Sequence, residues 1–286
     1  MLKYKDFGHG LRLGNYLFNL AFLTYAANKS NTEIQYKKDY FLWKYLENPP
    51  VLTDDFNYQE ELILPHTLYF GYDQNRKEFL IEHFKTNNDK IINISPNANF
   101  QSELWFCDNV EFVKSKLFIK DSEKNRVYKK YKRMFSKPTI GIGIRRGDFV
   151  NHGSFYQIPD DWYIRALESN FPNWRIENNI VIFSDDIQWC KQRYKHLPFY
   201  FAEPNDTHLI DDSNYYKDPM EQFILGTLMS NFIGGSSTFT WWQMWYVKNF
   251  NNGKVVHTGK NLTDGPVREG WINNDYYPKS WILYEV

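Results

Sequence analysis

The sequence predicts an α/β protein with two domains, and three observations support this. With 286 residues, the chain is long enough for two domains that each bury a core. In the second half, short apolar runs alternate with helical segments, as in a parallel sheet covered by helices on both faces. Lys137-Pro138 interrupts the helical stretch before it. We therefore expect one domain over residues 1–136 and another over residues 137–286, whose C-terminal residues can pack back on the first.

The first domain shows the less regular pattern. A glycine-rich loop, Gly8–Asn15, leads into a helix that ends at Lys29. Short strands are expected at residues 34–36 and 91–94, and one or two lysine-rich helices at residues 110–135. A loop that enters a helix N-terminus can bind an anion or a polar ligand. A tight turn that closes the helix onto a sheet explains the loop equally well.

The second domain shows the more regular pattern. Strands are expected at residues 140–144, 180–183, 199–201, 232–233 and 255–256, and helices at residues 161–168, 187–194, 220–229 and 241–247. Ligands of parallel α/β sheets bind beyond the carboxyl ends of the strands. The residues that directly follow these strands are therefore the candidates for a binding site.

The charge balance and the aromatic content favour a small ligand with a local site. Lys and Arg together number 34, as do Asp and Glu, so the chain has no general attraction to nucleic acid or to an anionic membrane. Aromatic residues make up 19% of the chain, and aromatic faces commonly line sites for sugars and bases. These values point to a carbohydrate or a nucleotide rather than to a polyanion.

The cysteines and the hydropathy indicate a soluble protein. Cys107 and Cys190 are too few for a disulfide framework and lack the spacing of metal ligands, so both are expected to be reduced. No stretch approaches the roughly 20 apolar residues of a membrane helix, and the N-terminus lacks the pattern of a signal peptide. We expect a cytoplasmic protein, either free or peripheral to a membrane.

The segment Gly143–Asp148 places charge at the end of a predicted strand. The strand alternates isoleucine with glycine, which lets another backbone or a ligand approach closely. Arg145 and Arg146 leave the strand end on opposite sides, so that one can reach a ligand while the other anchors the loop. A guanidinium binds two phosphate oxygens at once. A strand-to-turn junction, in which Asp148 only pairs with an arginine, is the equal alternative.

Two acidic segments are expected near the same sheet edge. Ser184, Asp185 and Asp186 follow a strand and open a helix, which either aspartate can cap. A carboxylate there can also accept a hydrogen bond from a ribose hydroxyl or a guanine edge. The adjacent aspartates are not spaced as metal ligands, so no metal is inferred. The residues Asp218 to Glu221 have the pattern of a capped helix start, which accounts for them by itself.

The segment Asn231–Trp242 has the most unusual composition. A strand ends in two glycines, the hydroxyl residues Ser236, Ser237 and Thr238 follow, and a helix begins. Backbone amides and hydroxyls at a helix N-terminus suit a diphosphate. A hydroxyl-rich N-cap before a core tryptophan pair is the alternative, but it leaves the glycines unexplained.

Together these segments resemble those of the α-1,2-fucosyltransferases, glycosyltransferase family 11. That family lies within a larger group that shares an Arg-Arg donor motif with α-1,6- and protein O-fucosyltransferases. The family's Gly-Gly-Leu-Gly-Asn resembles Gly10–Asn15, and its His-x-Arg-Arg-Gly-Asp resembles Gly143–Asp148. Its Phe-Ser-Asp-Asp matches Phe183–Asp186, and its Ser-Ser/Thr-Phe-Ser-Trp-Trp resembles Ser237–Trp242. A weaker match to the family's Phe-Gln-Ser lies within Asn99–Glu103. The four main matches occur in the family's order over nearly the whole chain, so they are far more specific together than singly.

The resemblance implies a GT-B fold, with two Rossmann-like domains facing a cleft, and transfer of fucose from GDP-fucose to a glycan acceptor with inversion. The hydroxyl of the acceptor is expected to be O2 of a galactose. Neither a metal nor a cofactor beyond the donor substrate is implied. Arg145 would hold the β-phosphate, and Asp148 would position the arginines or act as general base. The implied donor-binding residues are Arg145, Arg146, Ser184, Asp185, Asp186, Glu221, Ser236, Ser237, Thr238 and Phe239. The implied residues across the cleft, on the acceptor side, are His9, Gly14 and Asn15.

Two departures from the family's pattern leave alternatives open. Gly143 stands where the family has a histidine that contacts the donor nucleotide in relatives. A transferase with a different nucleotide sugar, or a sugar- or nucleotide-binding protein without catalysis, is therefore the alternative reading. The family's acidic residue ahead of the Ser-Ser/Thr-Phe motif falls near Glu221, and Glu221 or Asp218 would supply the guanine contact.

Overall fold

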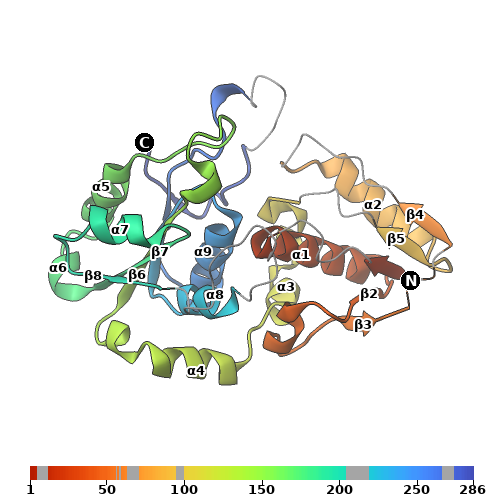
Figure 1. Ribbon diagram of the computed structural model, residues 1–286. Coiled ribbons are helices and arrows are strands. Elements are labelled where there is room, and N and C mark those ends of the chain that lie inside the picture. The colour runs from red at the N-terminus through yellow and green to blue at the C-terminus, as the bar shows by residue number, and fades with distance from the viewer. Residues whose placement is uncertain are drawn as a thin grey trace. The chain divides into compact units, whose positions relative to one another are not determined.

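The chain forms two compact α/β units in the computed structural model, which describes residues 1–4, 12–55, 57, 59–62, 71–94, 100–203, 219–265 and 274–286. Unit 1 comprises Met1–Lys120 and Gly270–Pro278, and unit 2 comprises Asp121–Glu269 and Lys279–Val286. Each unit contains one sheet whose described neighbouring strands are parallel, with helices packed on it (Figure 1). The predicted α/β class is confirmed.

The sheet of unit 1 has the strand order β3-β2-β1-β5-β4. Its strands are β1 (Leu2–Tyr4), β2 (Ile34–Lys37), β3 (Val51–Thr53), β4 (Glu60–Leu62) and β5 (Ile92–Ile94); its helices are α1 (Leu13–Lys29), α2 (Gln74–Thr86) and α3 (Val110–Lys116), with 3₁₀ helices η1 (Phe41–Tyr45), η2 (Glu103–Trp105) and η3 (Cys107–Asn109). Helix α1 is buried along most of its length because its leucine, phenylalanine and tyrosine side chains form the centre of the unit 1 core.

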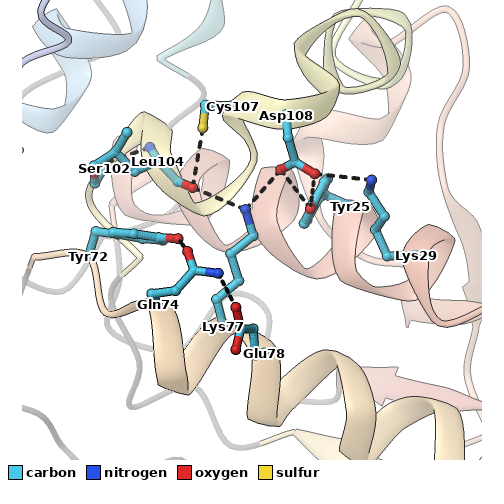
Figure 2. A network of polar contacts seen from close by, with 10 residues as sticks. All are labelled: Tyr25, Lys29, Tyr72, Gln74, Lys77, Glu78, Ser102, Leu104, Cys107 and Asp108. Carbon is cyan, nitrogen blue, oxygen red and sulfur yellow. Dashed lines mark hydrogen bonds and ion pairs between the residues drawn. The ribbon is translucent and has the colours of Figure 1, made fainter.

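A network centred on Asp108, shown in Figure 2, ties α1, α2 and η3 together. The carboxylate accepts hydrogen bonds from the Tyr25 hydroxyl at 2.7 Å and from Lys77 Nζ at 2.8 Å, and Lys29 Nζ lies 3.0 Å from it. Lys77 is 7% exposed and also donates to the carbonyl of Leu104 at 3.2 Å. Partial burial alone would raise the pKa of Asp108, but hydrogen bonds from Lys77, Tyr25 and Lys29 outweigh it and hold that pKa well below its usual range.

The sheet of unit 2 has the order β11-β10-β9-β6-β7-β8. Its strands are β6 (Thr139–Ile144), β7 (Asn179–Ser184), β8 (Phe199–Phe201), β9 (Asn231–Gly234), β10 (Val255–His257) and β11 (Ile282–Leu283); its helices are α4 (Asp121–Lys130), α5 (Asp160–Asn170), α6 (Trp174–Glu177), α7 (Ile187–Arg193), α8 (Met220–Thr227) and α9 (Thr238–Asn251), with 3₁₀ helices η4 (Lys132–Phe135) and η5 (Gly147–Phe149). The nine elements expected after residue 137 are present, with ends that differ by up to a few residues.

Different helices cover the two faces of this sheet. Ile140, Ile142 and Ile144 of β6 share a buried cluster with side chains of α5 and α7. The glycines between them face α9 and the side chains of β9: a methyl group on Gly143 would lie 2.4 Å from Thr240 Cγ2. Figure 1 shows α5 and α7 on one side of β6 and β7, and α8 and α9 on the other. The alternation of isoleucine and glycine in β6 thus has a structural reason. The isoleucines fill the core beneath α5 and α7, and the glycines leave room for the side chains of α9 and β9.

Unit 2 begins at α4, ahead of the boundary expected at residue 137. Helix α4 is attached to α8 by Glu221, whose carboxylate accepts from Lys130 Nζ at 2.6 Å and pairs with Arg126 Nη1 at 3.2 Å. The Tyr131 hydroxyl donates to the same carboxylate at 2.8 Å. The lysine-rich stretch therefore divides, so that α3 belongs to unit 1 and α4 to unit 2.

The elements that sequence reasoning did not predict are short or polar. β1, β3, β4 and β11 contain only two or three residues each, too few for a periodic pattern. Helix α2 buries only Lys77, Leu80 and Phe84, so its apolar stripe is narrow. Within the described ranges, no helix is long and apolar enough to cross a membrane.

Candidate functional site

Arg145 leaves the carboxyl end of β6 and is held by two carboxylates. Its Nη1 lies 2.9 Å from Asp185 Oδ2, and its Nη2 pairs with Asp148 Oδ1. The guanidinium also lies over the ring of Phe149, with Cζ 5.2 Å from the ring centroid. Its side chain is 18% exposed, whereas that of Asp148 is 48% exposed. The charged end of Arg145 is therefore fixed on its Asp185 side and more open on its Asp148 side.

Asp185 fixes the loop that follows β6. Its Oδ1 accepts a hydrogen bond from the backbone N–H of Arg146 at 2.9 Å, while its Oδ2 pairs with Arg145. A Cβ on Gly147 would lie only 2.4 Å from Asp185 Oδ2. A larger residue at this position would have to displace the carboxylate. This contact explains why a glycine follows the two arginines.

Arg146 points toward α5 and α7, away from the contacts of Arg145. Its guanidinium stacks on Trp189 of α7, with Cζ 3.4 Å from the ring centroid. Its nitrogens lie 3.6 Å from Asp186 Oδ2 and 3.8 Å from Asp160 Oδ1 of α5. The prediction that the two arginines diverge is confirmed. Arg146 joins the loop to two helices.

The start of α7 is capped by the segment that follows β7. Asp186 is the N-cap, and its Oδ1 accepts from the backbone N–H of Trp189 at 3.2 Å. The Ser184 hydroxyl oxygen accepts from the backbone N–H of Asp186 at 3.0 Å. Burial raises the pKa of the neighbouring Cys190 thiol to about 11, although a hydrogen bond with Ser184 opposes the shift. Of the two aspartates, Asp186 caps α7, and Asp185 holds the loop that follows β6 and begins with Arg145 and Arg146, which we call the arginine loop.

The start of α9 carries backbone amides that the side chain of its own N-cap residue does not cap. Ser237 occupies the N-cap position without a side-chain cap, and the first helical hydrogen bond runs from Trp241 N to Ser237 O at 2.8 Å. The amides of Thr238 and Phe239 precede that bond, and such N–H groups have no partner within a helix. Ser236 is turned inward, where its hydroxyl donates to the carbonyl of Tyr156 at 3.4 Å.

The strand register brings these segments to one edge of the sheet. β6 pairs with β7 so that Ile144 lies opposite Ser184, and with β9 so that Gly143 lies opposite Gly234. Arg145 therefore emerges between the loop that contains Asp185 and the loop that opens α9. A guanidinium beside a helix N-terminus can bind an anion with two or more oxygens.

The remaining predicted residues lie elsewhere or outside the described part. Glu221, 14% exposed, is occupied by Arg126, Lys130 and Tyr131 at the start of α8. Phe239 packs edge-on against Phe223, with ring centroids 5.4 Å apart. Asp218 falls outside the described residues. In the described ranges, no three His, Cys, Asp or Glu side chains are grouped so that they could hold a metal ion.

The residues predicted for the acceptor side belong to unit 1. Gly14 and Asn15 lie in the first turn of α1, and Asn15 Oδ1 accepts from Gln101 Nε2 at 3.2 Å. Gln101 belongs to the weaker Phe-Gln-Ser match, so two of the motifs are in contact. His9 falls outside the described residues.

Sequence reasoning missed three residues that shape this edge. Trp189 and Asp160 hold Arg146, and Thr240 packs against Gly143. Trp189 lies three residues after the capping aspartate, so its place in the first turn of α7 was available as a signal. The contacts of Asp160 and Thr240 join residues far apart in sequence, and no local pattern indicates them.

Two Rossmann-like α/β units, with polar side chains gathered at the strand ends of the second, are features of the GT-B class of glycosyltransferases. The chain belongs to glycosyl transferase family 11, because the model of that family matches residues 9–285. The resemblance found in the sequence is thereby confirmed.

One relative by sequence and several solved structures are similar to this chain. The O-antigen biosynthesis glycosyltransferase WbnK of Escherichia coli is 27% identical over 143 residues, which span 47% of this chain and 44% of WbnK. The match thus covers less than half of that relative's length.

Solved fucosyltransferases share the fold at low sequence identity. Fucosyltransferase NodZ from Bradyrhizobium is 14% identical at a TM-score of 0.53, over 86% of this chain and 91% of NodZ. A mutant of Arabidopsis thaliana FUT1 in complex with GDP is 13% identical at a TM-score of 0.55, over 91% of this chain and 70% of FUT1. POFUT1 in complex with GDP-fucose is 9% identical at a TM-score of 0.53, over 87% and 94%. This likeness confirms the predicted GT-B fold class.

Proposed function

We propose that this protein is an inverting fucosyltransferase that moves fucose from GDP-fucose to a hydroxyl of a glycan, with O2 of a galactose as the acceptor atom. The observation that carries the proposal is the register of β6 on β9, which sets Arg145 beside the loop that opens α9. A guanidinium and the amides of a helix start together suit a diphosphate. Membership in family 11 and the fold shared with fucosyltransferases solved with GDP and GDP-fucose support this donor.

In the proposed reaction, the acceptor hydroxyl attacks the anomeric carbon of fucose on the face opposite the diphosphate. The bond from that carbon to the β-phosphate oxygen breaks, the electron pair leaves with GDP, and the hydroxyl proton passes to a base. Arg145 and the amides of Thr238 and Phe239 would stabilise the negative charge that grows on the departing phosphate. The proposed reaction uses neither a metal nor a further cofactor.

The two carboxylates around Arg145 would have different roles. Asp185 is 15% exposed and also binds the Arg146 backbone, so it keeps Arg145 in place. Asp148 is about half exposed, so a diphosphate could take its place on Nη2 of Arg145 at small cost. The contact with Arg145 supports a positioning role for Asp148 more than a role as general base.

The other predicted residues would act around this centre. We assign Arg146, Ser184 and Asp186 to the support of the arginine loop, since their observed partners are helix α7 and its neighbours. A guanine contact from Glu221 would have to compete with the donors that α4 already supplies. Asn15, with Gly14 and His9, remains our proposal for the acceptor side.

Isothermal titration with GDP, GDP-fucose and GDP-mannose tests the donor assignment, and a transfer assay on a panel of galactosides tests the reaction. We expect GDP and GDP-fucose to bind and fucose to be transferred with inversion. Absence of binding by all three GDP species would refute the donor assignment. Binding without transfer to any galactoside would favour a non-catalytic sugar- or nucleotide-binding protein.

The metal-free chemistry has its own test. Activity should be unchanged after dialysis against EDTA, because Arg145 and the α9 amides are proposed to neutralise the leaving group. Loss of activity that Mg²⁺ or Mn²⁺ restores would show that this part of the proposal is wrong.

A further inference from the structure

Gly143 and Gly234 form a slot between two neighbouring strands, and the side chain of Thr240 fills it. The two glycines are register partners of β6 and β9. A Cβ on either one would lie 2.4 Å from Thr240 Cγ2, and a Cβ on Gly143 would also lie 2.6 Å from Thr240 Oγ1. Carbon atoms that are not bonded pack at about 3.5–4.0 Å, so neither strand can carry a side chain here while Thr240 is present.

Thr240 belongs to the first turn of α9, and its burial makes the contact rigid. It is 5% exposed and lies two residues after Thr238, whose amide is part of the helix start. One turn further along α9, Met244 packs against Gly234, so that a Cβ placed on this glycine would lie 2.6 Å from Met244 Sδ. The first two turns of α9 are therefore seated directly on the backbone of β6 and β9.

We propose that Thr240 is a positioning residue: by filling the slot between Gly143 and Gly234, it sets how closely the start of α9 approaches Arg145. Gly143 is a glycine because Thr240 occupies the space of its side chain. The inference rests on the proposed function only in assigning the amides of α9 to the diphosphate.

A matched pair of variants separates this role from general packing. Gly143→Ala would collide with Thr240, whereas Gly141→Ala, two residues earlier on the same face, would collide with Phe232 at 2.5 Å and leave the α9 start untouched. Both should lower the Tm, because added volume in a packed core forces shifts. Only Gly143→Ala should weaken GDP binding, by about tenfold, since hydrogen bonds weaken steeply when donors are displaced.

The partner substitution should rescue the damage. In Gly143→Ala/Thr240→Ala the colliding methyl and hydroxyl are gone, so GDP affinity should return to within about threefold of the parent. The Tm gives a readout that does not depend on GDP: Thr240→Ala should lower the Tm of the parent but raise that of Gly143→Ala.

Three outcomes would overturn the inference. One is GDP affinity in folded Gly143→Ala equal to that of the parent, and another is an additive loss of Tm in the double variant. If Gly143→Ala does not fold, Thr240→Val and Thr240→Ala decide instead: valine keeps the shape and should keep GDP affinity, and equal affinity in the alanine variant would refute the role. Failure of the parent to bind any GDP species would instead refute the proposed function. The Tm values of the single and double variants would still test whether Thr240 packs against Gly143 as inferred.

Discussion

Each unit contains a network of polar contacts centred on a carboxylate. The location of each network indicates whether it only stabilises the fold or also forms part of a candidate binding site. In unit 1, the Asp108 carboxylate accepts hydrogen bonds from Tyr25 and Lys77 and pairs with Lys29, and these three side chains come from α1 and α2 (Figure 2). Asp185 of unit 2 receives the side chain of Arg145 and the backbone of Arg146 at the carboxyl ends of strands. Both are rich in charge. Only the second lies at the edge where parallel sheets bind ligands, and beside a helix start.

The cations of the two networks differ in whether a ligand can reach them. Lys77 is buried, bound to Asp108 and Leu104, and covered by the ring of Tyr25 at 4.8 Å, so it has no open side for a ligand. Arg145 shares one nitrogen with a half-exposed aspartate that a stronger anion can replace. A charged cluster indicates a binding site when one of its contacts can be exchanged.

The largest expected effect is on transfer, from Arg145→Ala. Transfer should fall by at least about 10³-fold, because charge on the leaving phosphate loses its main cation. GDP binding should weaken by at least about 1.5 kcal/mol, as for a charge-assisted contact. Initial rates and isothermal titration measure the two.

The matched control in unit 1 is Lys77→Met, which removes a cation of similar burial. It should lower the Tm and leave GDP affinity within about twofold of the parent. Equal loss of GDP affinity in both variants would break the contrast between the networks.

The next effect separates the units by their response to acid. His257, at the end of β10, is 8% exposed, and burial lowers its pKa to about 4. Between pH 6.5 and 4 the unfolded chain binds this proton and the folded chain does not, so stability falls as pH falls through that window, by about 2–3 kcal/mol at most. Urea unfolding of the parent and of His257→Asn at pH 7 and 4.5 measures it, and an unchanged pH dependence in the variant would contradict the assignment.

Asp108 also makes the folded protein less stable as the pH falls, but at lower pH than His257. Its pKa is lowered by folding, so its contribution is present above about pH 4 and is lost as pH falls further. Asp108→Asn should cost roughly 1–2 kcal/mol at pH 7, a value reduced because the carboxylate is half exposed, although buried Lys77 loses its partner. Transfer by the folded variant should be unchanged, and a loss of activity without a loss of stability would show that this network also serves the reaction.

The smallest effect is expected from Asp148→Asn. If a diphosphate displaces Asp148 from Arg145, removing that charge should tighten GDP binding by up to about 1 kcal/mol, in line with an exposed ion pair. Weaker GDP binding in this variant would mean that Asp148 orients the arginine in the complex. Unchanged binding with transfer lost would instead support its role as general base.

The sequence could predict the parts of this molecule that local patterns determine. The alternating isoleucines and glycines of β6, the capped start of α7 and the glycine pair before α9 each carry their own signal, and together they indicated one sheet edge. It could not predict why Gly143 is a glycine, because the reason is a side chain nearly 100 positions later. Likewise, the engagement of Glu221 by α4 and of Arg146 by Trp189 depends on tertiary packing.

Hydrogen–deuterium exchange with and without GDP tests the central claim most directly. The amides of Thr238 and Phe239 precede the first helical hydrogen bond of α9, so they should exchange quickly in the free protein and become protected when a diphosphate accepts from them. We expect GDP to protect peptides that contain residues 238–240 and 145–148, and to leave those around Asp108 unchanged. Protection around Asp108, or none at the start of α9, would contradict the assignment of the diphosphate to this edge of unit 2.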